Sequence, residues 1–427
     1  MMSDASFPPG FLWGSATSAH QVEGNNVHSD WWAWEQAGRV KESSGLACDH
    51  YRRFAADFDL AAELGHTAHR LSIEWSRIEP AEGRFDEEAL AHYRAVLEAL
   101  RQRRLEPIVT LHHFTTPQWL GRTGGWLNPR VVDRFGRYVE RVAATLGGLA
   151  RYWVTINEPT VYVYMHYLMG EGPPGARDFR QALKVTEHLI RAHAAGYQRL
   201  HQADPAARVS IADYLPVFVP CRPWWPLDRL AVALTDRFFN AALLDTLMEG
   251  RWRVPGLPSW HIPEARGTLD YLGLNFYRRS FVRARLQPGQ WWSSSCDLKH
   301  HARQIRELTS WMGWEVHPES FFLTLSRWAK LGLPILVTEN GTCMADDARR
   351  WAFIADHLQA LARAVNEGAR VIGYCYWSLL DNFEWAHGFA PRFGLIEVDY
   401  ATQQRRIRES ARRYAEVCRT NRLTTGD

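Results

Sequence analysis

Short apolar runs alternate with longer amphipathic segments along the whole chain. Three of the amphipathic segments, residues 51–65, 87–104 and 134–148, repeat apolar side chains at the three- and four-residue spacing of a helix. The apolar runs are short and nearly continuous, which is typical of strands that are buried on both faces of a parallel sheet. Eight such strands are predicted, at residues 11–17, 68–75, 106–114, 152–158, 207–214, 269–277, 334–340 and 370–379.

The number of strand–helix units favours one fold class. Eight units within 427 residues match a (β/α)8 barrel, in which each parallel strand is followed by a helix. A doubly wound sheet is the competing arrangement, but residues 12–24 lack the GxGxxG spacing that would favour it. No linker and no repeat divides the chain. We therefore expect residues 1–427 to form a single (β/α)8 TIM-barrel domain, with its active site at the C-terminal ends of the strands.

Composition and charge exclude some partners. Hydrophobic residues make up 46% of the chain, charged residues make up 23%, and the formal net charge is +3. Without a run of five like charges, nucleic acid and anionic membranes are poor candidate partners. Residues 1–14 have Asp4 where a signal peptide has basic residues, and they lack an apolar stretch, so we expect a cytoplasmic protein. The run VYVYMHYLM (161–169) is too short to cross a membrane.

Cysteine and tryptophan usage adds two expectations. The six cysteines are scattered and form no CxxC pair, so reduced, buried thiols are expected rather than disulfides or a zinc site. The chain has 20 tryptophans. They suit a large core, and their clusters also suit platforms on which sugar rings stack; their number alone does not separate these interpretations.

Polar side chains occur where the predicted strands end. Catalytic groups of a (β/α)8 barrel lie at these C-terminal ends, so the residues are candidates for an active site. The candidates are Gln21, Glu23, His113, Asn157, Glu158, Asn275, Tyr277, Glu339, Asn340, Trp377, Asp381 and Glu384.

Glu158 and Glu339 form the most informative pair. They end the fourth and seventh strands in similar contexts, TINEP and TENG. These strands lie three places apart in an eight-stranded barrel, so their ends face each other across its mouth. Two facing carboxyl groups suit cleavage of a glycosidic bond, because one protonates the leaving oxygen while the other attacks the anomeric carbon or activates water. The alternative is that each glutamate caps a helix or forms an ion pair.

His112 and His113 raise the question of a metal site. No histidine or carboxylate follows them at a ligand spacing of three or four residues, so we expect no metal and no other cofactor.

Several motifs, in order and spread over residues 7 to 415, resemble glycoside hydrolase family 1, the retaining β-glucosidases and β-galactosidases. TINEP, TENG and DNFEW together are highly specific for this family. The other stretches that carry the resemblance are FLWGSATSAHQVEG, HRLSIEWSRIEP, TLHHFTTPQWL, LGLNFYRRS and the region around DNFEW from Tyr376 to Tyr400.

The resemblance implies roles for individual residues. Glu158 matches the general acid/base, and Glu339 matches the nucleophile that forms a covalent glycosyl intermediate. Asn275 and Tyr277 match substrate-binding positions near the nucleophile, and Arg70 matches the arginine beside it. The residues implied to bind the sugar hydroxyls are Gln21, His113, Asn157, Glu384 and Trp385, with Trp377 as the floor under the ring.

Such a mechanism requires the two glutamates to differ in protonation state. Arg70 and the Tyr277 hydroxyl should stabilise the ionised form of Glu339, whereas burial and the opposing carboxylate should keep Glu158 protonated. A retaining mechanism places the two carboxyl groups about 5–5.5 Å apart, and an inverting mechanism places them roughly 6.5–9.5 Å apart.

The resemblance implies hydrolysis of terminal β-D-glucosyl residues, and also of β-galactosyl or β-fucosyl residues, from small β-glycosides or short oligosaccharides. Glu384 argues against phosphorylated sugars, because its carboxylate would repel a phosphate. Phe114 stands where many members have Trp, which alters a stacking contact. Two alternatives stay open: a site that acts mainly as a transglycosidase, and a sugar-binding pseudoenzyme. A homo-oligomer is possible.

Overall fold

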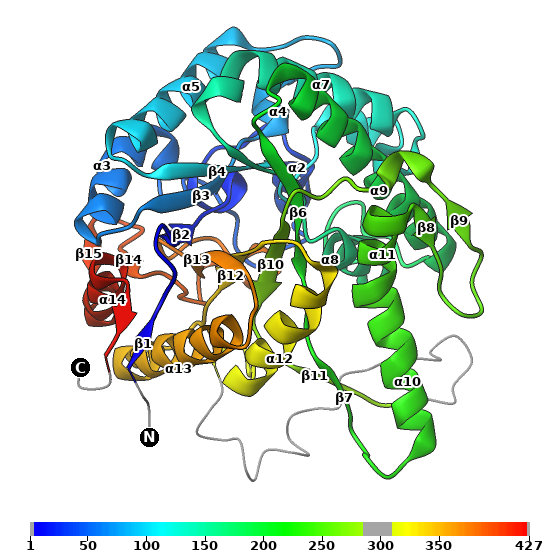
Figure 1. Cartoon of the computed structure of the whole chain (residues 1–427). Helices are drawn as coiled ribbons and strands as arrows, with labels where there is room; N and C mark the ends of the chain where they lie inside the picture. Colours follow the sequence, from blue (N-terminus) through cyan, green and yellow to red (C-terminus); the bar gives the residue numbers. More distant parts are fainter. Residues whose placement is uncertain (1–3, 285–309, 425–427) are drawn as a thin grey trace.

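Eight parallel strands close into a barrel (Figure 1). The structure, a computed structural model, describes residues 4–284 and 310–424. Each strand pairs with the next barrel strand along the chain, and β13 pairs with β2 to close the barrel. The strands are β2 (Leu12–Ala16), β3 (Ala68–Ser72), β4 (Glu106–His112), β5 (Tyr152–Asn157), β6 (Arg208–Tyr214), β10 (Leu272–Phe276), β12 (Ile335–Asn340) and β13 (Val371–Trp377). All eight fall within the predicted runs, so the predicted (β/α)8 barrel is confirmed.

Helices surround the barrel, including the three that were predicted (Figure 1). Three of the four longest described helices begin after aspartates: Asp86, Asp178 and Asp346 accept hydrogen bonds from backbone N–H groups of the first turn, which satisfies donors that lack a partner inside the helix. The main helices are α3 (His50–Glu63), α5 (Glu87–Gln102), α7 (Val131–Leu146), α9 (Phe179–Ala203), α11 (Ala242–Glu249), α12 (Pro318–Trp328), α13 (Asp347–Asn366) and α14 (Glu409–Thr420).

Apolar side chains fill two layers. Inside the barrel, small and medium residues such as Ala68, Val154 and Leu336 pack together. A larger layer lies between the strands and the helices. Five of the described tryptophans are at most 1% exposed, which supports a core role for them; these are Trp13, Trp75, Trp126, Trp153 and Trp252.

The segments after β6 and β10 extend the mouth of the barrel on one side. There β7 (Phe218–Pro220) pairs in parallel with β11 (Ser280–Val282). Helix α10 (Pro226–Asp236) follows β7 and continues into a π-helical turn, η4 (Arg237–Ala241). Figure 1 shows β7, β11 and α10 projecting together away from the barrel.

The thiols differ in part from the expectation. Cys48, Cys343, Cys375 and Cys418 are free and buried, as predicted. Cys221 is disulfide-bonded, so the prediction of reduced thiols is wrong for this residue. Among the described helices, none combines the length and the apolar character that are needed to cross a membrane.

Candidate active site

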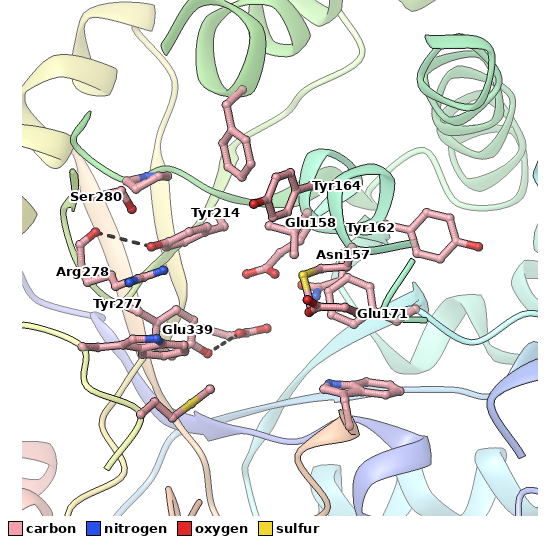
Figure 2. A pocket seen from close by; sticks show the side chains of 18 of the residues that line it. Asn157, Glu158, Tyr162, Tyr164, Glu171, Tyr214, Tyr277, Arg278, Ser280 and Glu339 are labelled. Carbon is pink, nitrogen blue, oxygen red and sulfur yellow. Dashed lines mark hydrogen bonds between the residues drawn. The ribbon is translucent and has the colours of Figure 1, made fainter. Parts of the chain in front are cut away.

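Glu158 lies at the turn from β5 into the short helix α8 (Pro159–Val163). Its backbone adopts a left-handed conformation, with φ of 44°, which is uncommon for a residue other than glycine. The N–H of Glu158 donates to the carbonyl of Ala212 on β6 at 2.6 Å. Pro159 fits the first position of α8 because its missing N–H would have no partner there. The turn directs the Glu158 carboxylate into the pocket (Figure 2).

Glu339 is held from two directions at the end of β12. The buried Arg70 donates to its Oε1, and the Tyr277 hydroxyl donates to its Oε2 at 2.5 Å. Gly341 follows shortly after, and a Cβ at this position would lie 1.9 Å from the carbonyl oxygen of Trp377. The glycine of the TENG motif is therefore required by the close approach of β12 and β13 at the barrel mouth.

Arg70 connects the two candidate carboxylates. Its Nη2 donates to Oδ1 of Asn157 at 2.6 Å, while its Nη1 contacts Glu339. Asn275 donates to Oε1 of Glu158 at 2.8 Å and to Oδ1 of Asn157 at 3.2 Å. Both glutamates therefore belong to one hydrogen-bonded network that spans the barrel.

The environments of the two glutamates differ in charge. Burial raises the pKa of Glu158 well above its ordinary value, and the nearby charge of Glu339 raises it further, while the hydrogen bond from Asn275 opposes the shift. Glu339 instead lies against the positive charge of Arg70. Burial, followed by the charge of Glu339, raises the pKa of Tyr277 well above its ordinary value, so its hydroxyl remains a donor.

Polar and aromatic side chains from the segments that follow β2, β4 and β13 also line the cavity. Gln21 donates to Oε2 of Glu384 at 3.2 Å. Burial, followed by the charge of Glu339, raises the pKa of Glu384 to about 8, although the bond from Gln21 lowers it. The His113 ring is nearly parallel to the rings of Trp377 and Trp385, at centroid distances of 6.0 and 6.4 Å. Burial and then Arg70 lower the pKa of His113 well below its ordinary value, so the ring is neutral.

Of the eleven residues to which the resemblance assigns a role, nine line one cavity of about 400 Å³. The other two, Arg70 and Asn275, are fully buried behind it and contact the glutamates from there. Asn275 lies beside Glu339, its register partner on β12, as expected, and its amide donates to Glu158. The nine that line the cavity are Gln21, His113, Asn157, Glu158, Tyr277, Glu339, Trp377, Glu384 and Trp385.

Several lining residues were not predicted. Tyr214 ends β6, so the same strand-end rule would have identified it. Tyr164, Phe218 and Phe239 lie on short elements outside the barrel, where the sequence offers no comparable signal. Asp213 was also missed; it is fully buried on β6, and its charge raises the pKa of Glu158.

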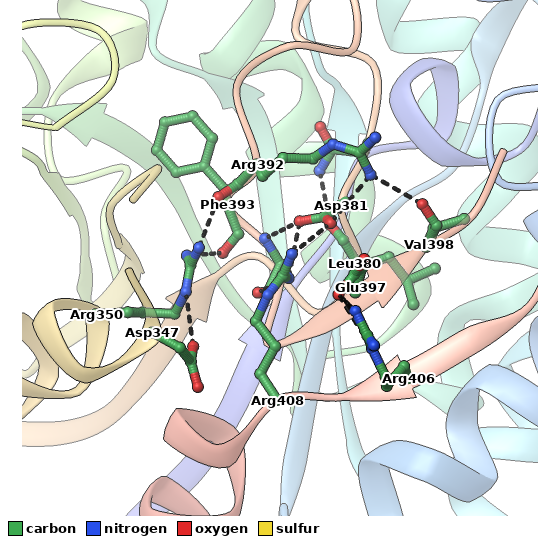
Figure 3. Close-up of polar contacts among 12 residues, drawn as sticks. Asp347, Arg350, Leu380, Asp381, Arg392, Phe393, Glu397, Val398, Arg406 and Arg408 are labelled. Atoms are coloured by element: carbon green, nitrogen blue, oxygen red, sulfur yellow. Dashed lines mark hydrogen bonds and ion pairs between the residues drawn. The ribbon is translucent and has the colours of Figure 1, made fainter. Parts of the chain in front are cut away.

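The loop that carries Glu384 and Trp385 is fixed by buried ion pairs (Figure 3). Asp381 binds Arg408 through both oxygens, at 3.0 and 2.8 Å, and accepts the N–H of Gly394 at 2.9 Å. Arg350, also fully buried, donates to the carbonyls of Thr342 at 2.7 Å and Phe393 at 3.2 Å. These contacts connect the segments that follow β12 and β13.

The described part of the chain contains no group of three or more His, Cys, Asp or Glu residues that could hold a metal ion. His113 contacts Nδ2 of Asn157 through its Nε2, at 3.3 Å, and His112 packs against the rings of Trp126 and Tyr162.

Comparison with known proteins agrees with this geometry. The model of "Glycosyl hydrolase family 1" matches residues 3–423. A β-glucosidase A from Thermotoga maritima is 31% identical, with 99% of this chain and all of that protein covered. A β-galactosidase from Sulfolobus acidocaldarius is 32% identical, over 97% of this chain and 96% of that protein.

Solved structures give the same result. A β-glycosidase from Pyrococcus horikoshii has a TM-score of 0.92 and 39% identity, over 99% of this chain and 97% of that one. The Thermotoga maritima β-glucosidase in complex with glucoimidazole has a TM-score of 0.89 and 31% identity, over 97% of this chain and 99% of that one. The predicted enzyme class, a β-glucosidase-like glycoside hydrolase, is thereby confirmed. The chain belongs to glycosyl hydrolase family 1.

Proposed function

We propose that the protein is a retaining β-glycosidase that hydrolyses terminal β-D-glucosyl residues of O-glycosides and also accepts β-galactosyl and β-fucosyl residues. One observation carries the proposal: two glutamates line a single cavity in opposite electrostatic settings. Glu339 is paired with Arg70 and Tyr277, which suits an ionised nucleophile, and the raised pKa of Glu158 suits a proton donor.

In the first step, an Oε atom of Glu339 attacks the anomeric carbon. The bond from that carbon to the glycosidic oxygen breaks, and Glu158 transfers its proton to the leaving oxygen, which departs as an alcohol. The products are a glycosyl ester of Glu339 and an ionised Glu158.

In the second step, water attacks the anomeric carbon of the ester, and Glu158 takes up one of its protons. The ester bond breaks, Glu339 regains its charge, and the sugar leaves with its original β configuration. Esterification removes the charge of Glu339, one of the causes that raise the pKa of Glu158. The pKa of Glu158 therefore falls when the ester forms, so that Glu158 is ionised and can act as the base in the second step.

We assign binding of the sugar hydroxyls to Gln21, His113, Asn157, Glu384 and Trp385, and the floor under the ring to Trp377. Asn275 and Arg70 instead position the two glutamates, because both are fully buried and bonded to protein groups.

The proposal is tested by Glu339→Ala with a 4-nitrophenyl β-D-glucoside. Turnover should fall by at least about a thousandfold, and added azide should restore product as the α-glycosyl azide, identified by NMR. Glu171 offers a matched control, because it is another carboxylate that lines the cavity and has no assigned role (Figure 2). Glu171→Ala should cost far less and should not respond to azide. Near-normal activity of Glu339→Ala would exclude the nucleophile assignment.

A further inference from the structure

The cavity has two chemically different sides, and the order of the barrel strands separates them. Gln21, His113 and Glu384 follow β2, β4 and β13, which belong to one arc of the barrel. The elements that follow β5, β6 and β10 form the other arc. Apolar side chains from these elements line the cavity, and we call six of them the apolar wall: Val161, Met165, Phe218, Phe239, Phe281 and Val282.

A row of aromatic rings leads from the candidate nucleophile to this wall. Tyr277, whose hydroxyl binds Glu339, has its ring centroid 6.0 Å from that of Tyr214. The Tyr214 ring lies 6.2 Å from Phe239, and Phe239 lies 5.6 Å from Phe218 on β7. Tyr164 adds a ring 6.4 Å from Phe239, and in Figure 2 Tyr164 and Tyr214 flank Glu158. The apolar surface therefore begins beside the reacting groups and continues outward.

We propose that the group released from the sugar is an apolar aglycone, an alkyl or aryl alcohol, which lies along the apolar wall. This inference rests on the proposed function, because Glu158 must protonate the glycosidic oxygen that joins the sugar to the aglycone. The sugar then occupies the arc with Gln21, His113 and Glu384. The bound aglycone extends from the glycosidic oxygen, next to Glu158, toward Phe239 and Phe218.

A second sugar fits this side less well than a hydrocarbon. Its hydroxyl groups would lose water against six side chains that offer no hydrogen bond, and such unpaired burial costs free energy. The polar residues that line this side include Tyr164, Glu171, Tyr214, Thr235, Arg278 and Ser280. Two of them are engaged by the protein: the Tyr214 hydroxyl donates to the carbonyl of Arg278 at 3.5 Å, and the Arg278 guanidinium lies over the Trp314 ring at 5.3 Å. A methylene group that packs against the wall is instead removed from water, and this transfer contributes favourably to the free energy of binding.

The test is a chain-length series of methyl, butyl, hexyl and octyl β-D-glucoside, with cellobiose as the sugar-aglycone substrate. From butyl to octyl the acidity of the leaving alcohol is nearly constant, so a trend in kcat/KM reports contact with the wall. We expect kcat/KM to rise by up to about fourfold for each added methylene, and octyl glucoside to exceed cellobiose. Octyl glucoside is used below its critical micelle concentration.

A variant locates the effect. Phe239→Ala should reduce the ratio of kcat/KM for octyl over methyl glucoside at least about tenfold, since the loss of one aromatic ring removes contact for several methylenes. Phe218→Ala provides an independent second variant. Leu230→Ala is the matched control, because Leu230 is an apolar residue of the adjoining α10 that is 55% exposed and lies outside the cavity; it should leave the ratio unchanged.

The outcomes separate the two proposals. If methyl and 4-nitrophenyl glucosides are not hydrolysed, the proposed glycosidase function itself fails. If they are hydrolysed but kcat/KM does not rise with chain length, or cellobiose is preferred over octyl glucoside, only the apolar-aglycone proposal is overturned. A chain-length effect that survives in both Phe239→Ala and Phe218→Ala would equally overturn it, because the wall would not be its cause.

Discussion

Arg408 binds Asp381 with two parallel hydrogen bonds, and Asp381 lies three residues before Glu384 (Figure 3). Asp381 is fully buried, and Arg408 directly precedes α14. A contact from the C-terminal part of the chain therefore fixes the loop that brings Glu384 and Trp385 to the cavity.

Asp381→Asn should destabilise the protein and weaken substrate binding. Removing one partner of a buried ion pair costs about 3–5 kcal/mol, because the other charge stays buried without compensation. Thermal unfolding should show a lower Tm, and KM for a glucoside should rise. Glu397→Gln is the control: Glu397 pairs with the exposed Arg406 (Figure 3), and such surface pairs contribute about 0–1 kcal/mol. Equal losses in the two variants would contradict the assigned role of Asp381.

Tyr277→Phe should lower kcat/KM about tenfold to a hundredfold, since a hydrogen bond to a charged group is worth about 1.5–3 kcal/mol. The change removes only the hydroxyl that donates to Glu339 at 2.5 Å. Steady-state kinetics with 4-nitrophenyl glucoside provide the measurement. Tyr214→Phe is a matched control, because the Tyr214 hydroxyl bonds to a backbone carbonyl rather than to a glutamate; a comparable loss there would show that the effect is not specific to Glu339.

Glu158→Gln should affect substrates according to their leaving groups. General acid catalysis contributes about 10²–10⁴-fold, so alkyl glucosides should lose activity in this range. Glycosides of acidic phenols, such as 2,4-dinitrophenol, need little protonation and should lose much less in the first step. The comparison of kcat/KM between the two substrate types decides the point, and equal losses would argue against Glu158 as the acid.

The pH dependence follows from the direction of the Glu158 shift. Burial and then the charge of Glu339 raise its pKa, so the protonated, active form persists to higher pH than an ordinary carboxyl group would allow. In the wild type, kcat/KM should fall as pH rises through this raised pKa. In Glu158→Gln, assayed with an activated glycoside, this alkaline limb should disappear. A limb that remains near pH 8 would instead report Glu384, whose pKa is raised to about 8.

Gly341→Ala should reduce both stability and activity. The added Cβ would meet the carbonyl of Trp377 at 1.9 Å, so the backbone beside Glu339 must shift. Overpacking of this kind costs about 1–3 kcal/mol, which thermal unfolding would reveal. Gly121→Ala on α6 (Gln118–Arg122) is the control, because a Cβ there would meet nothing within 4 Å. That variant should be neutral or stabilising, since alanine favours helix.

The barrel could be predicted because each strand is a nearly continuous apolar run that the fold buries on both sides. Glu158 and Glu339 could be predicted because they end such runs, where a parallel barrel collects its functional groups. The two catalytic roles stay predictions, as does the extent of the single domain.

Other features could not be predicted from local patterns. Whether Asn275 faces Glu158 or Glu339 depends on side-chain orientation, which Thr338 helps to fix by donating to Oδ1 of Asn275 at 2.7 Å. Phe218 and Phe239 line the cavity because the tertiary structure places the short elements β7 and η4 at its edge. Their apolar character alone would suit the core equally well. The disulfide of Cys221 likewise could not be predicted, because the scattered cysteines form no spacing motif that indicates pairing.

Arg70 on β3 holds Asn157 on β5 and Glu339 on β12, three strands of which no two are neighbours in the barrel. The placement of the reacting groups is therefore set mainly by side chains of the barrel strands, together with Glu158 and Tyr277, which directly follow the ends of β5 and β10. Insertions, deletions and substitutions in the outer segments can alter which alcohol is accepted while the bond-breaking geometry stays the same. The chemistry and the substrate range of this scaffold can accordingly evolve independently.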